Sequence, residues 1–252
     1  MALGGLVACA ASPSMALQDA VTRGSLFGVN DALHRGADPN GKSRDGLPLI
    51  AFAVGRGYFD VASALVEAGG NPKVSLNGVD VFFLLTAMGP QCPAPLLDAM
   101  IKAGRSPQAI DERSGSIIIM GLTFGAESCV TSLIAAGANV KVVSDVGETT
   151  LHAAAMGSTR TRVDELIASG VNIDAQMEGG ETPLMLAASR SDAGGTADDV
   201  IETLLTHGAN PCLRDSKGRD ASKIARARGA TSRANRLESD CNQWGKGRDS
   251  LR

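Results

Sequence analysis

Aromatic residues are scarce in this chain of 252 residues: they make up 3% of it, with a single Trp and a single Tyr. The chain also lacks any run of about 18 apolar residues, so no segment predicts a membrane-spanning helix. Its net charge of −3 argues against a nucleic-acid-binding protein, because such proteins usually present a basic face. Ala, Gly and Leu are abundant instead, which favours short helices that pack closely.

Motifs for catalysis and for metal binding are missing as well. The sequence contains no G-x-S-x-G, no G-x-x-x-x-G-K-[ST] and no H-E-x-x-H. Its five cysteines form no Cys-x-x-Cys pair and none lies at metal-ligand spacing from a histidine. The three histidines, His34, His152 and His207, are expected to be structural. We therefore predict no enzymatic activity, no metal and no cofactor.

The N-terminal stretch Met1–Ala16 is apolar and carries no charged side chain. Within it, Leu6–Cys9 resembles the lipobox of bacterial lipoproteins, in which the cysteine is lipidated after cleavage. An export signal needs a positive start and a longer apolar core than the residues before Cys9 supply. Two interpretations remain. The stretch is a disordered leader of a cytoplasmic protein, or it is the remnant of an export signal that starts upstream, on a periplasmic protein or one anchored through lipidated Cys9.

A helix-ending signature recurs along the chain, centred on a glycine. Successive glycines are 33, 35, 33, 33 and 38 residues apart: Gly36, Gly69, Gly104, Gly137, Gly170 and Gly208. A glycine here takes the left-handed conformation that closes the last helical turn, and an Asn or Asp that follows bonds the turned backbone. A short amphipathic run precedes each glycine, and a second apolar helix precedes that run. Each unit is therefore predicted to be helix, loop, helix and turn.

These units resemble the repeats of the ankyrin-repeat family, whose pattern is G-x-T-P-L-H-x-A-A. Gly147–Ala155 and Gly180–Ala188 match that pattern, and Gly36–Asn40 matches the helix-ending stretch. Thr at this place caps the first helix and Pro suits its first turn. The resemblance covers roughly residues 16–240. It implies an all-α ankyrin-repeat solenoid of helix-turn-helix repeats joined by short β-hairpin-like turns.

We divide the chain into a leader (1–15), an ankyrin-repeat domain (16–236) and a C-terminal tail (237–252) that shows no repeat. The domain holds about seven repeats, which we number one to seven: 15–44, 45–77, 78–113, 114–146, 147–178, 179–217 and 218–236. The first and last are expected to cap the stack, because no neighbour covers the outer face of a terminal repeat.

Three of these repeats depart from the pattern. Bulky apolar residues fill the first helices of repeats three (Asp80–Leu85) and four (Ile117–Leu122), with Phe124 close by. They indicate either tighter burial or an apolar spot that is exposed to anchor a partner. Repeat six has a longer loop, Ser189–Asp199, which is either a tolerated insertion or part of a binding face.

The remaining cysteines also leave two alternatives. Cys92 and Cys129 lie in adjacent repeats, while Cys212 follows a turn and Cys241 lies in the tail. If the protein is exported, each pair could form a disulfide, and the second would attach the tail to the last repeat. Otherwise the four are free, partly buried thiols.

The resemblance implies a non-enzymatic scaffold that recognises a partner protein through its concave face and its hairpin tips. In the family, the residues around the repeat-opening glycine project toward partners. Carried over to this chain, they are Arg44, Asp45, Leu47, Asn77, Val79, Arg113, Ser114, Ser116, Asp145, Val146, Glu148, Glu178, Glu181, Lys217 and Arg219. The tips of repeats five and six are acidic and the last tip is basic.

We expect a monomer of bacterial type that neutralises or tethers another protein and does not bind nucleic acid. One specific role is an immunity-type inhibitor of a toxin or an envelope enzyme. The rival hypothesis is a small-ligand-binding or enzymatic site at the repeat-six loop.

Overall fold

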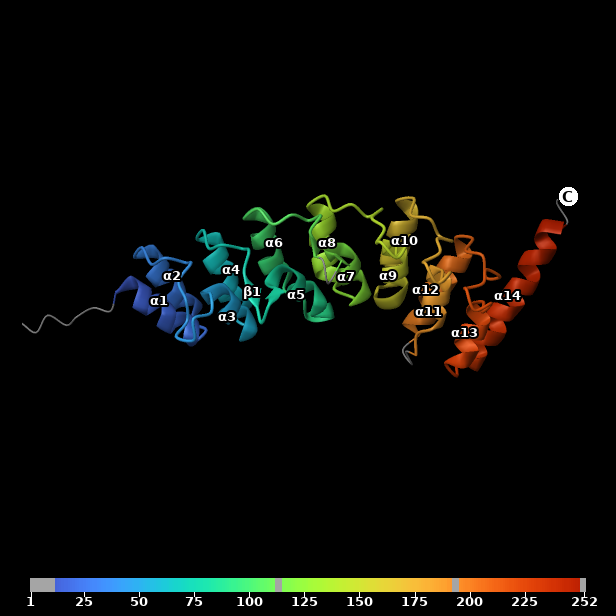
Figure 1. Ribbon diagram of the computed structural model, residues 1–252, viewed down its shortest axis with the longest axis horizontal. Coiled ribbons are helices and arrows are strands. Elements are labelled where there is room, and N and C mark those ends of the chain that lie inside the picture. The colour runs from blue at the N-terminus through green and yellow to red at the C-terminus, as the bar shows by residue number, and fades with distance from the viewer. Residues whose placement is uncertain (1–11, 112–114, 192–194, 250–252) are drawn as a thin grey trace, which may run out of the picture. The chain divides into compact units, whose positions relative to one another are not determined.

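The computed structural model describes residues 12–111, 115–191 and 195–249, with side chains up to residue 244 (Figure 1). Of the residues singled out above, Cys9, Arg113, Ser114 and 192–194 lie outside these ranges. The chain divides into two compact units, residues 1–85 with 93–106 and residues 86–92 with 107–252, which are described separately. Among the described residues, no helix has both the length and the apolar character needed to cross a membrane.

In the first unit, helices pair in sequence order. Its elements are α1 (Pro13–Thr22), α2 (Leu26–His34), α3 (Leu49–Gly55), α4 (Phe59–Glu67), β1 (Ser75–Leu76), β2 (Val79–Asp80) and α6 (Ala94–Lys102), with α5 (Val81–Ala87) ending in the second unit. Helix α1 packs on α2 and α3 packs on α4, and the second helices α2, α4 and α6 pack side by side.

The second unit repeats this arrangement. Its elements are η1 (Gly89–Gln91), β3 (Ile110–Asp111), β4 (Gly115–Ser116), α7 (Ile117–Thr123), α8 (Glu127–Ala135), α9 (Thr150–Gly157), α10 (Arg160–Ala168), α11 (Pro183–Ala188), α12 (Thr196–Thr206), α13 (Ala221–Ala227) and α14 (Thr231–Asp249). The first helices α7, α9, α11 and α13 pack in series, each against the next. The predicted order of helix, loop, helix and turn is confirmed.

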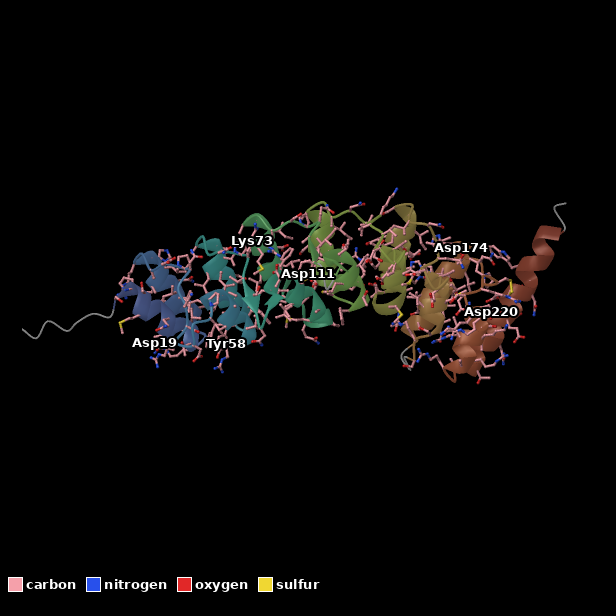
Figure 2. The ribbon with its side chains drawn as sticks, viewed as in Figure 1. Asp19, Tyr58, Lys73, Asp111, Asp174 and Asp220 are labelled. Carbon is pink, nitrogen blue, oxygen red and sulfur yellow. A yellow bond between two sulfur atoms is a disulfide. The ribbon has the colours of Figure 1, made fainter. Side chains whose placement is uncertain are left out.

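Side-chain caps begin the first helices of the later repeats. Thr149 and Thr182 lie at the N-caps of α9 and α11 and accept hydrogen bonds from backbone N–H groups of the first turn. Asp220, which is labelled in Figure 2, caps α13 in the same way: it accepts a hydrogen bond from the N–H of Lys223. These bonds satisfy donors that a helix start leaves without partners.

The six signature glycines end the second helices as predicted. All have φ between 82° and 98°, in the left-handed region. At Gly137, for example, the N–H donates to the carbonyl of Ile134, and the N–H of Ala138 donates to that of Leu133. The helix therefore closes on its own carbonyls before the chain enters the next hairpin.

The bulky first helices of repeats three and four are buried. Phe82 and Ile117 are both 0% exposed, and Phe83 is 3% exposed. The guanidinium of Arg105 covers the ring of Phe82 at 4.8 Å and pairs with Asp80 at 2.6 Å. The hypothesis that these helices expose an apolar spot is therefore wrong. Phe124, just beyond α7, has a side chain that is 52% exposed.

Helix α14 crosses the boundary that the sequence suggests between residues 236 and 237. It packs against α13, buries Ala234 and Leu237, and forms an ion pair from Arg233 to Asp198 at 2.7 Å. Residues 237–249, which show no repeat in the sequence, are therefore part of a helix that continues from the last repeat.

Candidate functional site

The hairpin tips that join the later repeats share one backbone turn. In repeat five, the N–H of Ser144 donates to the carbonyl of Glu148 over 2.8 Å, and the N–H of Gly147 donates to the carbonyl of Ser144 over 3.0 Å. Residues 177–181 and 215–219 contain the same two bonds. Because the backbone is closed on itself, the directions in which the side chains leave the backbone are fixed at each tip.

Neighbouring tips are also bonded to one another. The N–H of Glu178 donates to the carbonyl of Val146, and the N–H of Ser216 donates to the carbonyl of Gly179, each over 2.9 Å. We call residues 144–148, 177–181 and 215–219 the tip surface. Its backbone is one hydrogen-bonded structure within the second unit, so the Cα atoms of successive tips have little freedom to move relative to one another.

Most residues that the family pattern places at the tips are accessible in this structure. The exposed ones are Arg44, Asp45, Asn77, Val79, Asp145, Val146, Glu178 and Lys217, and the half-buried ones are Leu47, Glu148, Glu181 and Arg219. Ser116 differs, because it is only 9% exposed. It pairs with Ile110 in the β3–β4 ladder and directly precedes α7, so its side chain does not project.

The tips of repeats five and six carry carboxylates that are not neutralised. Within the described part of the chain, no cation forms an ion pair with Asp145, Glu148, Glu178 or Glu181. Burial removes water from Glu148 and raises the pKa of its carboxyl above the usual value. This part of the tip surface therefore has a net negative charge that favours a cationic partner group.

The last tip is less basic than its sequence suggests, because Arg219 forms an ion pair with Asp215 at 2.7 Å. Burial alone would raise the pKa of Asp215, but hydrogen bonds from Arg219 and from the N–H of Lys217 lower the pKa below its ordinary value. Lys217 is thus the exposed basic side chain of this tip.

His152 has the structural role expected of it. Its Nδ1 accepts a hydrogen bond from the N–H of Thr149 at 3.2 Å, which leaves the proton on Nε2. Nε2 lies 3.0 Å from the carbonyl oxygen of Glu181, to which it donates. The ring is 0% exposed, and burial lowers its pKa from the ordinary value. A neutral imidazole therefore connects α9 to the next hairpin.

The other two histidines bond near the second helices. Nδ1 of His34 lies 2.6 Å from the carbonyl oxygen of Asn30, and Nε2 of His207 lies 2.9 Å from a carboxylate oxygen of Asp164. Across residues 12–111, 115–191 and 195–249, no group of three or more His, Cys, Asp or Glu side chains is placed to hold a metal ion.

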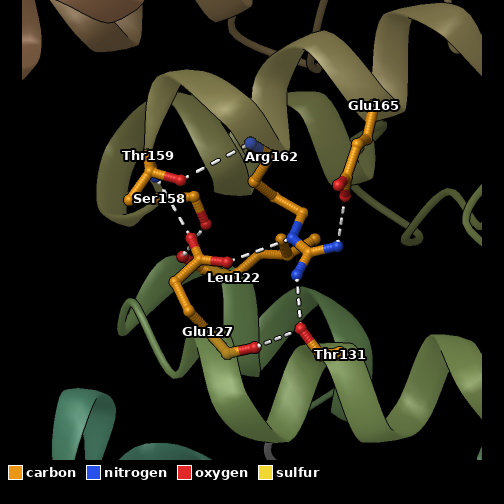
Figure 3. A network of polar contacts seen from close by, with 7 residues as sticks. All are labelled: Leu122, Glu127, Thr131, Ser158, Thr159, Arg162 and Glu165. Atoms are coloured by element: carbon orange, nitrogen blue, oxygen red, sulfur yellow. Dashed lines mark hydrogen bonds and ion pairs between the residues drawn. The ribbon is translucent and has the colours of Figure 1, made fainter.

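A polar network around Arg162 was not predicted from the sequence (Figure 3). The guanidinium contacts Glu127 at 3.0 Å, Thr131 at 2.8 Å and Glu165 at 2.5 Å. Glu127 also accepts from the N–H of Thr159 over 3.1 Å. Arg162 is only 8% exposed, so the network lies largely away from solvent. It connects α8 to α10 and so holds two successive repeats together.

Both possible cysteine pairs are disulfides in the structure. Cys92 is bonded to Cys129, with their Cα atoms 6.1 Å apart, and Cys212 is bonded to Cys241, with their Cα atoms 5.0 Å apart. The first joins the turn before α6 to α8, and the second joins the turn after α12 to α14. The alternative of four free thiols is therefore not what the structure contains.

Two apolar residues near the tips were missed from the sequence. Ile110, in β3, is 73% exposed and Val143, just before the tip of repeat five, is 56% exposed. Both lie outside the positions that the family pattern marks. The available signal was a β-branched apolar side chain at the start of a predicted hairpin: Ile110 directly precedes Asp111, and Val143 directly precedes Ser144.

The repeat-six loop is tied at both described ends. Arg190 donates to the carbonyl of Ala155 at 3.3 Å and to the hydroxyl of Thr196 at 3.2 Å. Arg233 of α14 donates to the carbonyl of Arg190 at 2.6 Å. Since α12 already begins at Thr196, the loop is shorter than the sequence suggests, and its described ends serve to hold α11, α12 and α14 together.

Comparison with known proteins agrees with this architecture. Residues 118–215 match the family model described as "Ankyrin repeats (3 copies)". The crystal structure of the human ASB11 ankyrin repeat domain is similar, with a TM-score of 0.63 and 21% identity over 88% of this chain and 96% of that one. The E3 ubiquitin-protein ligase KEG of Arabidopsis thaliana is 29% identical over 156 residues. That match covers 55% of this chain but only 9% of the ligase.

Proposed function

Because the chain has the ankyrin-repeat fold, we propose that it is a protein-binding module whose tip surface recognises a partner protein. Ankyrin repeats generally mediate interactions between proteins, and their scaffold is typically non-enzymatic. The observation that carries the proposal is the bonding between successive tips, which holds the backbone at exposed Asp145, Val146 and Glu178 in one arrangement. A surface that is already ordered loses little conformational entropy when it binds.

The binding residues of the proposal are the accessible members of the predicted set. In the second unit they are Asp145, Val146, Glu148, Glu178, Glu181, Lys217 and Arg219. In the first unit they are Arg44, Asp45, Leu47, Asn77 and Val79.

We further propose that the protein works in an oxidising compartment, where it neutralises or tethers its partner. The two disulfides support this location, because disulfides persist outside the reducing cytoplasm. The lipobox-like segment ending at Cys9 suggests the periplasm or a lipid anchor. In an immunity-type role the captured partner would lose activity when the protein is added, whereas a tethered partner would keep it.

Affinity capture in the native cell tests the binding proposal. The bait is compared with a tip variant, Asp145→Ser/Val146→Ser/Glu178→Ser. A matched control changes exposed residues of the second helices, Arg160→Ser/Glu202→Ser. We expect a partner that the wild type and the control retain and that the tip variant loses. Equal retention by the tip variant and the control would place the binding surface elsewhere.

A further inference from the structure

A cleft opens beside the tip surface, between the β3–β4 hairpin and the following turn of the second unit. Its volume is about 460 Å³, and it is lined by Ile110, Asp111, Gly115, Ser116 and residues 142–145. We call it the tip cleft. Ile110 and Val143, which line it, are the two most exposed large apolar side chains described in this unit, at 73% and 56%.

The apolar character continues from the cleft onto the tip surface. Val146, at the tip of repeat five, is also exposed, at 40%. Isolated exposed apolar side chains are common on proteins, but three that line one cleft and the tip beside it favour a binding site. The cleft volume lies at the low end for ligand pockets, which span about 300–1,000 Å³, so it suits side chains of a bound segment.

The charge around the cleft selects the chemistry of that segment. Asp145 lines the cleft, and Glu178 lies on the neighbouring tip, whose N–H is bonded to the carbonyl of Val146. Neither carboxylate forms an ion pair with a described cation. Lys141 is the lysine nearest to Asp145 in the sequence, but its amino group lies beside Gly170, just after α10. A Cβ atom placed on Gly170 would be 3.4 Å from Nζ of Lys141.

We propose that the tip cleft binds a partner segment in which an apolar side chain is flanked by Lys or Arg. The apolar side chain fills the cleft against Ile110 and Val143, and the cations pair with Asp145 and Glu178. An acidic segment would bring like charges together, which disfavours binding. This assignment rests on the proposed function, because it names the partner chemistry of the same surface.

Selection from a random peptide library tests the assignment. The library is selected on the immobilised wild type and depleted on Ile110→Ser/Val143→Ser. The enriched peptides are expected to combine Leu, Ile, Val or Phe with Lys or Arg. A synthetic copy of one such peptide should bind Ile110→Ser/Val143→Ser about tenfold more weakly than it binds the wild type, since the variant loses two apolar contacts.

Two further variants separate the parts of the proposal. Phe124→Ser removes an exposed apolar side chain of the same unit away from the cleft and should leave peptide binding unchanged. Asp145→Asn/Glu178→Gln should weaken binding and reduce its dependence on NaCl, because it removes the charges that salt screens. Circular dichroism of each variant confirms that it is folded.

Enriched peptides without cations, unchanged affinity of Ile110→Ser/Val143→Ser, or no enrichment at all would overturn the assignment. Its failure is distinct from failure of the proposed function. If capture still depends on Asp145, Val146 and Glu178 while the library yields no basic apolar peptide, the surface binds a partner of different chemistry. If the peptides bind as expected but no cellular partner depends on the tips, the function is wrong and the cleft chemistry stands.

Discussion

Nε2 of His152 lies 3.0 Å from the backbone carbonyl oxygen of Glu181, so the first helix of repeat five is bonded to the hairpin of repeat six. Nδ1 of the same ring accepts from the N–H of Thr149 at the start of α9. One neutral side chain therefore fixes both a helix start and the position of the next tip. The tip surface depends on such bonds between repeats.

Replacing His152 by Ala should lower the free energy of unfolding by about 2 kcal/mol near neutral pH, because buried polar groups lose their partners. The wild type should also lose stability as the pH falls below about 6.5, the ordinary pKa of histidine. Burial lowers the pKa of His152 in the folded state, so the unfolded chain takes up the proton first. Denaturant unfolding measured over a series of pH values checks both effects.

The matched control is His34→Ala, which changes a histidine on the helix surface. This variant should have a free energy of unfolding near that of the wild type. Its stability should still fall as the pH is lowered below about 6.5, as in the wild type. If the stability of His152→Ala fell between pH 7 and pH 5 as much as that of the wild type, the neutral imidazole of His152 would not cause the pH dependence.

Removal of either disulfide should lower stability by about 2–4 kcal/mol, because the crosslink restricts the unfolded chain. The pairs Cys92→Ala/Cys129→Ala and Cys212→Ala/Cys241→Ala should nevertheless differ locally. The second variant should exchange the amide hydrogens of α14 faster, because Cys241 lies within that helix. Hydrogen exchange with mass spectrometry makes the comparison, and a reductant should reproduce both effects in the wild type. Insensitivity of the wild type to reductant would contradict the two disulfides.

Arg162→Met should destabilise the protein by about 2 kcal/mol. The change removes the bonds to Glu127 and Thr131 and leaves a carboxylate that is partly shielded from water. Arg160→Met is the control, since that side chain is 63% exposed and its pair with Asp164 is 3.8 Å long. The control should change stability by less than about 0.5 kcal/mol. The thermal unfolding of both variants is measured side by side. Equal midpoints would show that the network around Arg162 does not stabilise the fold.

Gly180→Ala should lower the free energy of unfolding more than Gly218→Ala does, although both glycines have positive φ, at 79° and 70°. A Cβ on Gly180 would lie 3.0 Å from the Cα of Asp215 on the next tip, whereas one on Gly218 meets nothing within 4 Å. The second variant should lose about 1 kcal/mol from the strained backbone alone. The first should lose more, because the tips must also move apart. Equal losses in denaturant unfolding would show that the tips do not pack on each other.

The repeat unit could be predicted because its signals are local. The glycine that ends a helix and the threonine that starts one act within a few residues, so Gly137 and Thr149 were identified correctly from the sequence. The burial of Phe82 could not be predicted in the same way, because Arg105, which covers its ring, lies in the turn after α6, more than 20 residues further along the chain.

The missed features depend on neighbours about one repeat away. Arg162 bonds to Glu127 and Thr131 of the preceding repeat, and no pattern within α10 marks that pairing. The tip cleft similarly needs Ile110 and Val143 from two successive hairpins. The helical tail was missed because α14 is held by α13, Asp198 and a disulfide, rather than by a strongly apolar face of its own.

The central claim is that a partner protein binds at the tips. Hydrogen exchange of the protein, alone and with the partner recovered by capture, tests it most directly. We predict slower exchange at residues 142–148 and 177–181 in the complex, with α8, α10 and α12 unchanged. Protection confined to α8, α10 and α12, with the tips exchanging as in the free protein, would contradict the account.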